Sequence, residues 1–156
     1  MAKKGDKFEK KSFLEKVKPL PRVDLEQVLE EDCPVIFDTN FLFVPFEFPV
    51  DIIAEMERLL GTQYELFIYE GTLYELSDIE KKGDKNKKFL PLIISMLERF
   101  DFKIISSDNR YVDGDILKNA QHGILVATND SQLRKQLWSI PSRVMYMRQK
   151  RYLEIS

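Results

Sequence analysis

Five acidic residues follow apolar segments at widely separated places in this sequence. They are Asp38, Glu75, Asp113, Asp115 and Asp130. In VIFDTN, Asp38 comes directly after an apolar run, and in VATND, Asp130 closely follows another. Carboxylates from distant segments could bind a hard divalent cation together, and Mg²⁺ or Mn²⁺ prefers such oxygen ligands. This pattern indicates metal-dependent hydrolysis of a phosphodiester, in which no protein nucleophile is needed.

The apolar pattern predicts the elements that would bring these acids together. Strands are predicted at residues 33–37, 65–69, 102–105, 123–127 and 144–147, and helices at 24–31, 51–60, 72–80, 89–100, 115–121 and 131–138. Strict alternation with doubly buried strands predicts a three-layer α/β/α sandwich around a central five-stranded parallel sheet. Ligands of such sheets bind at the carboxyl ends of the strands, where we expect the acids to meet.

Each acid also has a structural interpretation. Asp113 and Asp130 precede helical segments, as N-caps do, and Glu75 stands three residues after Thr72, as in a capping box. Asp38 is the hardest to explain structurally, because TNFLFVP is not an obvious helix start. Each close carboxylate pair costs on the order of 4 kcal/mol at an effective dielectric near 20, which a cation offsets and capping does not. The metal-free protein is therefore predicted to contain at least one carboxyl with a raised pKa.

Composition excludes several other classes of protein. A chain of 156 residues with one cysteine, Cys33, and one histidine, His122, has no internal disulfide or Cys-rich zinc site, and fits a reducing, cytoplasmic compartment. We interpret both residues as structural. A signal peptide, an apolar stretch near 18 residues and a glycine-rich nucleotide motif are all absent from the sequence, so neither secretion nor membrane insertion is expected.

Charge is distributed unevenly along the chain. Residues 1–20 contain seven lysines and three acids, whereas the whole chain has a net charge of −2. This predicts a basic, partly flexible arm at residues 1–22, either simply solvated or binding phosphate, followed by a single domain at residues 23–156.

Four motifs, in order, resemble those of PIN-domain nucleases. They are VIFDTN, LYEL, VDGDILKNA and ILVATND, within a resemblance that spans residues 34–156. The resemblance implies a five-stranded parallel α/β/α sandwich and an endoribonuclease site. Its catalytic and metal-binding acids would be Asp38, Glu75, Asp113 and Asp130, with Asp115 as an additional metal ligand and Asn40 and Thr128 in support. Gly114 stands where many relatives carry another acid.

The resemblance also implies an RNA substrate, either single-stranded or a ribosomal precursor. Two basic groups could contact it: Lys81, Lys82, Lys85, Lys87 and Lys88, and Arg134, Lys135, Arg143, Arg148, Lys150 and Arg151. Their alternative role is a solvated surface. Phe41, Phe43, Phe46 and Phe48 could stack on bases, although a core edge or a dimer contact is the favoured interpretation.

The leading hypothesis is a Mg²⁺- or Mn²⁺-dependent endoribonuclease of ribosomal RNA processing, because IPSRVMYMRQKRYLEIS resembles that branch of the family rather than the toxin branch. Its partners would be RNA and a second copy of the chain or ribosome-assembly proteins. The alternatives are a catalytically inactive PIN-like RNA-binding or ribosome-assembly factor and a toxin-type ribonuclease.

A receiver domain would need a phosphoacceptor Asp after the third strand and a Lys after the fifth, where the sequence has IISSDNR and MYMRQK. A haloacid-dehalogenase-type phosphatase would need an acid at Asn40.

Overall fold

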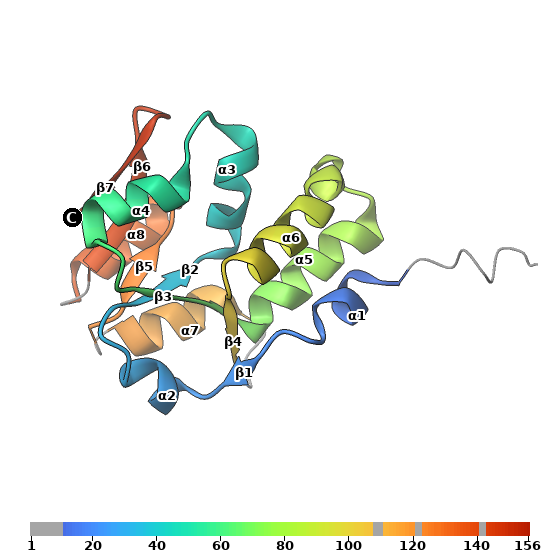
Figure 1. Cartoon of the computed structure of the whole chain (residues 1–156), viewed down its shortest axis with the longest axis horizontal. Helices are drawn as coiled ribbons and strands as arrows, with labels where there is room; N and C mark the ends of the chain where they lie inside the picture. Colours follow the sequence, from blue (N-terminus) through green and yellow to red (C-terminus); the bar gives the residue numbers. More distant parts are fainter. Residues whose placement is uncertain (1–10, 108–110, 121–122, 141–142) are drawn as a thin grey trace, which may run out of the picture.

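The computed structural model describes residues 11–107, 111–120, 123–140 and 143–156. Within them, one seven-stranded sheet is covered by helices on both faces (Figure 1). The strands are β1 (Arg22–Val23), β2 (Pro34–Phe37), β3 (Glu65–Tyr69), β4 (Lys103–Ile105), β5 (Leu125–Ala127), β6 (Arg143–Arg148) and β7 (Tyr152–Ile155). Their order is β1-β4-β3-β2-β5-β6-β7, and only the β6–β7 pairing is antiparallel.

The predicted three-layer fold and its five parallel strands are confirmed as β2 to β6. The structure adds β1 at one edge of the sheet and β7 at the other. β1 is too short to give a sequence signal, with two residues paired to Ile104 and Ile105. β7 follows a tight turn in which Gln149 and Lys150 have φ of 53° and 58°. Such turns favour Asn-Gly or Asp-Gly, and because this turn has Gln-Lys, the sequence does not predict the hairpin.

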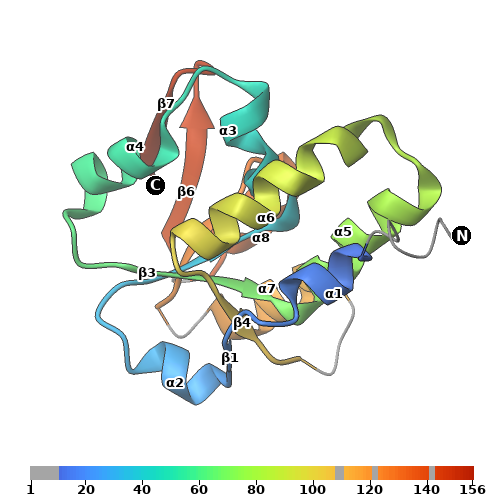
Figure 2. The same cartoon turned by 45° about the vertical axis from the view of Figure 1, so that its right-hand side comes forward.

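The helices form the two outer layers. They are α1 (Phe13–Val17), α2 (Leu25–Leu29), α3 (Val44–Glu47), α4 (Ile52–Leu60), α5 (Glu70–Lys82), α6 (Leu90–Arg99), α7 (Val112–Asn119) and α8 (Ser131–Trp138), with 3-10 helices η1 (Thr39–Phe43) and η2 (Lys85–Phe89). Side chains alternate across β2: Val35 and Phe37 pack with residues of α1 and α3 to α6, while Ile36 packs with α2, α7 and α8. Figure 2 shows α5 and α6 in front of the sheet and α7 and α8 behind it.

The described part of the predicted arm, residues 11–22, packs against the rest of the structure. Phe13 and Val17 of α1 are buried, and the Phe13 backbone N–H donates to Glu80 Oε1 of α5 at 3.1 Å. The three apolar residues of this five-residue helix, Phe13, Leu14 and Val17, span barely one turn, which is too short to establish a helical period, so the sequence did not reveal this contact. Residues 1–10 and His122 lie outside the described residues.

The phenylalanine-rich segment after β2 folds into η1 and α3. Phe41 and Phe43 are buried in the core, where Phe41 meets Phe37 edge to face with ring centroids 5.0 Å apart. Phe46 and Phe48 are partly buried against the same core. These contacts agree with the core interpretation and not with base stacking.

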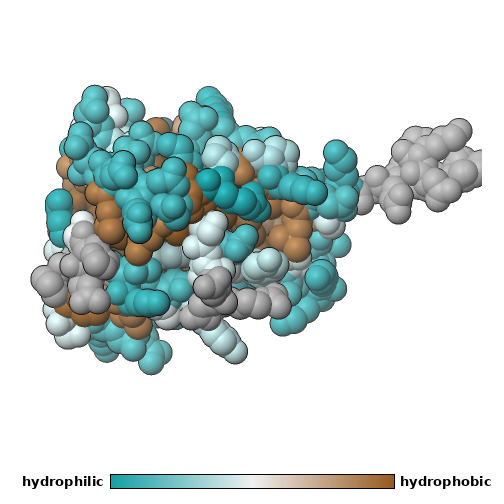
Figure 3. Space-filling view, turned by 90° about the horizontal axis from the view of Figure 1, so that it is seen from below, coloured by the Kyte–Doolittle hydropathy of each residue, from teal (hydrophilic) through white to brown (hydrophobic). Residues whose placement is uncertain are grey.

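The surface seen in Figure 3 is mainly hydrophilic, with hydrophobic residues visible in patches between the polar ones. Within the described residues, no helix combines the length and apolar character that crossing a membrane requires.

Candidate active site

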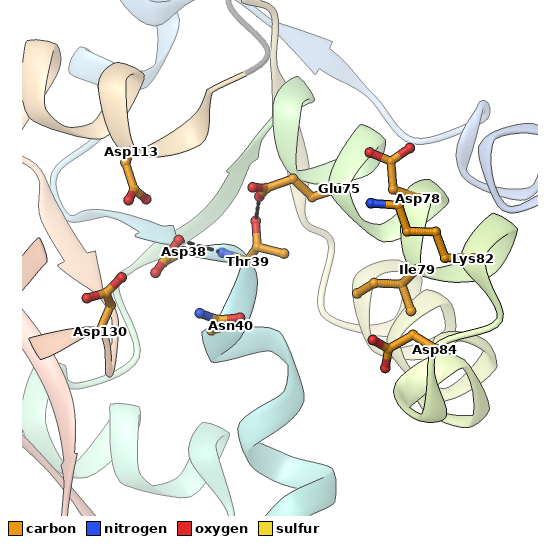
Figure 4. Close-up of a pocket in the computed structure, with 10 residues that line it drawn as sticks. All are labelled: Asp38, Thr39, Asn40, Glu75, Asp78, Ile79, Lys82, Asp84, Asp113 and Asp130. Atoms are coloured by element: carbon orange, nitrogen blue, oxygen red, sulfur yellow. Dashed lines mark hydrogen bonds between the residues drawn. The ribbon is translucent and has the colours of Figure 1, made fainter. Parts of the chain in front are cut away.

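The candidate site lies where the order of the strands reverses, at the carboxyl ends of β2 and β5. These strands are neighbours, and the Asp38 N–H donates to the Ala127 carbonyl at 2.9 Å. Such switch points are the usual ligand sites of open parallel sheets. A cavity of about 410 Å³ opens there (Figure 4), lined by Asp38, Thr39, Asn40, Glu75, Asp78, Ile79, Lys82, Asp84, Asp113 and Asp130.

Asp38 lies deep in this cavity, with only 4% of its surface exposed. Its Oδ1 accepts from the Thr39 N–H and its Oδ2 from the Thr128 hydroxyl, both at 2.8 Å. Burial raises the pKa of Asp38 to about 6, and the charges of Asp113 and Glu75 contribute to the increase, while the two hydrogen bonds oppose it. The predicted raised carboxyl pKa is thus found at Asp38.

Glu75 projects from α5 toward η1. The Thr39 hydroxyl donates to Glu75 Oε1 and lies 3.0 Å from the Thr72 hydroxyl. The capping-box interpretation of Glu75 is wrong, because α5 begins at Glu70 and Tyr69 is its N-cap. Loss of hydration raises the pKa of Glu75, and Asp113 and Asp78 raise it further.

Asp113 and Asp130 reach the cavity from the starts of α7 and α8. Asp113 lies in the first turn of α7, where burial and the nearby Asp130 charge raise its pKa. Asp130 does cap α8, because its Oδ1 accepts from the N–H groups of Gln132 and Leu133 at 2.9 and 3.1 Å. Both bonds use one oxygen, so capping is compatible with a place in the cavity wall.

Thr128 links two of these acids. Its hydroxyl is fully buried, donates to Asp38, and accepts from the Asp130 N–H at 3.0 Å. Asn40, the other residue expected in support, is exposed and lines the cavity.

Asp115 does not line the cavity. It is buried, and its Oδ2 accepts from the Ser107 hydroxyl at 2.6 Å. Residues two apart on a helix face in different directions, so α7 cannot turn both Asp113 and Asp115 toward the cavity. The expected role of Asp115 as a metal ligand therefore has no support in this arrangement.

Four lining residues were not predicted as parts of the acidic site: Thr39, Asp78, Ile79 and Asp84. Asp78, Ile79 and Lys82 follow Glu75 by three, four and seven residues, so they share its face of α5. That spacing is visible in the sequence and could have identified them. Lys82, which was predicted to bind RNA, lies in the wall of the acidic cavity and adds a positive charge to it.

The other predicted basic residues fall into three groups: exposed residues, residues with intramolecular partners, and Arg143, which lies far from the acids. Lys81, Lys85, Lys87 and Lys88 are exposed at the end of α5 and in η2, Lys135 is exposed on α8, and Lys150 and Arg151 are exposed in the β6–β7 turn. Two others have intramolecular partners: Arg134 stacks on Tyr146 at 4.4 Å, and Arg148 pairs with Glu154 at 2.9 Å. Arg143 is the first residue of β6. It therefore lies at the amino ends of the parallel strands, whereas the acids lie at their carboxyl ends.

The acids face a common cavity without forming a preassembled metal site. Across the described ranges, no group of three or more His, Cys, Asp or Glu side chains has the arrangement needed to hold a metal ion. The donors nevertheless fit a hard divalent cation, because they are all carboxylate oxygens. Loss of hydration is the main cause of the raised pKa values of Asp38, Glu75 and Asp113, and neighbouring carboxylates raise them further; a cation would offset both effects.

The fold and this cavity define a class: parallel α/β domains with clustered carboxylates at the switch point of the sheet. Comparison with known proteins identifies the family within that class. The family described as "PIN like domain" matches residues 35–150, and the chain belongs to it.

Two known proteins illustrate the relationship. The chain is 33% identical over 124 residues to a protein of Methanocaldococcus jannaschii named Ribonuclease VapC4, covering 78% of this chain and 95% of that protein. A solved structure titled "Structure of the PIN domain endonuclease Utp24" superposes with a TM-score of 0.63 and 20% identity, covering 79% of this chain and 90% of that chain. At this identity the structural likeness supports the shared fold.

Proposed function

We propose that this protein is a metal-dependent endoribonuclease that hydrolyses RNA phosphodiester bonds. The observation that carries the proposal is the convergence of Asp38, Glu75, Asp113 and Asp130, from four separate elements, on one cavity. The name of the M. jannaschii relative, a ribonuclease, supports the reaction class.

Asp38, Glu75, Asp113 and Asp130 are the residues that would hold Mg²⁺ or Mn²⁺. When bound, such a cation supplies activation of water and stabilisation of the negative charge that develops on the phosphate. In the reaction, a water oxygen forms a bond to phosphorus while the bond to the leaving 3′ oxygen breaks, and that oxygen gains a proton.

The neighbouring hydroxyl groups hold the acids in place. Thr128 and the Thr39 N–H each bond one oxygen of Asp38, so its carboxylate has a fixed orientation. The Thr39 hydroxyl positions Glu75 in the same way. Outer hydrogen bonds of this kind fix ligands before a cation binds and lower the cost of assembling the site.

Basic side chains allow a polyanion to approach this acidic cavity. Lys82 lies in its wall, and the exposed lysines of η2 lie beyond the end of α5. We propose single-stranded or ribosomal precursor RNA as the substrate, on the basis of the resemblance of the C-terminal segment. A cytoplasmic location, and a second copy or ribosome-assembly proteins as partners, complete this proposal.

The test is a Mn²⁺ titration of wild type and Asp38→Asn, read by calorimetry and by cleavage of RNA. Asp32→Asn is the matched control, because it makes the same chemical change on an exposed residue near the amino end of the same strand. We expect Mn²⁺-dependent cleavage by wild type and Asp32→Asn, and its loss in Asp38→Asn with RNA binding retained. RNA binding without cleavage by the wild type would favour the inactive RNA-binding alternative.

A further inference from the structure

A second cavity adjoins the acidic one along α5. It has a volume of about 570 Å³ and is lined by Tyr74, Glu75, Asp78 and Tyr111. Glu75 and Asp78 also line the acidic cavity, so the two hollows share a wall. Figure 4 shows these two acids on α5 at the edge of the acidic site. We call the second hollow the tyrosine cavity.

The two tyrosines come from elements that also carry proposed catalytic acids. Tyr74 immediately precedes Glu75 on α5, and Tyr111 stands two residues before Asp113 at the start of α7. The Tyr111 carbonyl accepts from the Asp115 N–H at 3.2 Å, which ties its backbone to the first turn of α7. A ligand in the tyrosine cavity would therefore be held at a fixed position relative to Glu75 and Asp113.

The residues that line the tyrosine cavity favour the base of a nucleotide over its phosphate. Glu75 and Asp78 repel a phosphate and accept hydrogen bonds, whereas nucleobases present N–H donors at their edges. Tyrosine rings offer flat faces on which any base can stack. Tyr111 is 78% exposed, so its ring is accessible to a ligand. The cavity suits a base and not the RNA backbone.

We propose that the tyrosine cavity binds an unpaired nucleobase next to the scissile phosphate, with Tyr74 and Tyr111 as the stacking residues. This inference rests on the proposed function and adds a base-binding subsite to it. A base held in a duplex could not enter the cavity, so the tyrosines would make the enzyme selective for single-stranded RNA.

The test compares Tyr111→Ala, Tyr111→Phe and Tyr74→Ala on a short single-stranded oligoribonucleotide. Trp138→Ala is the control, because Trp138 is 56% exposed yet lines neither cavity. Loss of one stacked base should raise KM by about 5- to 150-fold in both alanine variants, with a smaller change in kcat. Tyr111→Phe should keep the wild-type KM, and unchanged thermal unfolding would exclude misfolding as the cause.

A second arm places a single abasic nucleotide at successive positions around the cleaved bond. At one position, wild type should lose affinity by at least this factor, and the loss in Tyr111→Ala should be smaller, because one of the two stacking contacts of that base is already absent. Additive losses at every position, or a Tyr111→Ala effect no larger than that of Trp138→Ala, would overturn the inference.

Binding measurements separate this inference from the proposed function. Fluorescence anisotropy with the same oligonucleotides needs no cleavage. Tyrosine-dependent binding without cleavage by the wild type would reject the nuclease proposal and keep the base site. Cleavage by the wild type that is unchanged in both tyrosine variants would support the nuclease proposal and reject the base site.

Discussion

At the scale of single residues, Asp38 is a buried acid in a setting that disfavours its charge. Its folded pKa is about 6, whereas an unfolded aspartate titrates near 3.9. The folded protein therefore binds this proton more tightly than the unfolded chain does. The contribution of Asp38 to the free energy of unfolding is therefore largest at low pH. It is lost as the pH rises from about 4 to about 6, and the total decrease is about 3 kcal/mol at most.

Asp38→Asn should consequently stabilise the metal-free protein at neutral pH. We expect the variant to exceed wild type in free energy of unfolding at pH 7.5 in EDTA, and to match it closely at pH 4. Urea unfolding at both pH values measures the difference. An advantage independent of pH would contradict the raised pKa of Asp38.

Thr128→Val removes a hydroxyl that serves two acids while keeping the shape of the side chain. Asp38 Oδ2 would lose its 2.8 Å donor, and the Asp130 N–H its 3.0 Å acceptor. We expect a loss of about 1–3 kcal/mol in stability and a decrease of about 10- to 100-fold in Mn²⁺ affinity. Thr128→Ser keeps the hydroxyl and should restore the affinity, as calorimetry would measure. Equal affinities in the Val and Ser variants would exclude a role for the hydroxyl.

At the scale of elements, α5 presents one face to the acidic cavity. Lys82 lies in the cavity wall and Lys81 does not, although both are exposed at the end of the helix. Lys82→Ala should therefore raise the KM for RNA more than Lys81→Ala does, and the gap should shrink at high salt. Steady-state cleavage at two salt concentrations tests this. Equal effects would assign both lysines to general electrostatic attraction.

The short helix α1 contributes to the core despite its place in a lysine-rich segment. Phe13 is fully buried, and α1 contacts both α5 and α6. Phe13→Ala should cost about 3–5 kcal/mol in free energy of unfolding, whereas Lys16→Ala on the exposed side should cost little. Urea denaturation of the two variants compares them. A small loss for Phe13→Ala would mean that the domain begins after α1.

At the scale of the whole molecule, the proposed cation site connects the two sides of the sheet's switch point. Elements from residues 38 to 130 contribute acids to it, so binding should stabilise the entire domain. We expect Mn²⁺ to raise Tm, by an amount equivalent to about 2.7 kcal/mol at 100 times the Kd. Binding should release protons at pH 5.5 and fewer at pH 8, because the raised carboxyl pKa values lie closer to the lower pH. Neither stabilisation nor proton release at millimolar Mn²⁺ would reject the shared site.

The amino-acid sequence was enough to predict the α/β/α sandwich and the carboxyl ends of its strands as the place where Asp38, Glu75, Asp113 and Asp130 meet. Buried strands and amphipathic helices leave local patterns, and parallel strands place their carboxyl ends together wherever the chain crosses over. The composition of the cavity beyond these four acids depended on which face each helix turns inward. Non-local packing sets that orientation, so only the tertiary structure showed that Asp115 faces Ser107 and does not line the cavity.

Tertiary structure alone also decided the edges of the sheet and the ligand contacts beside the acids. β1 has only two residues and pairs with a distant strand, so it leaves no pattern in the sequence. β7 follows a tight turn that contains no glycine, so the sequence does not predict its hairpin. The Thr39–Glu75 hydrogen bond, and the cavity lined by Tyr74 and Tyr111, each depend on the packing of segments more than 30 residues apart. Local sequence specifies the elements of this protein, while long-range contacts specify what those elements place in its cavities.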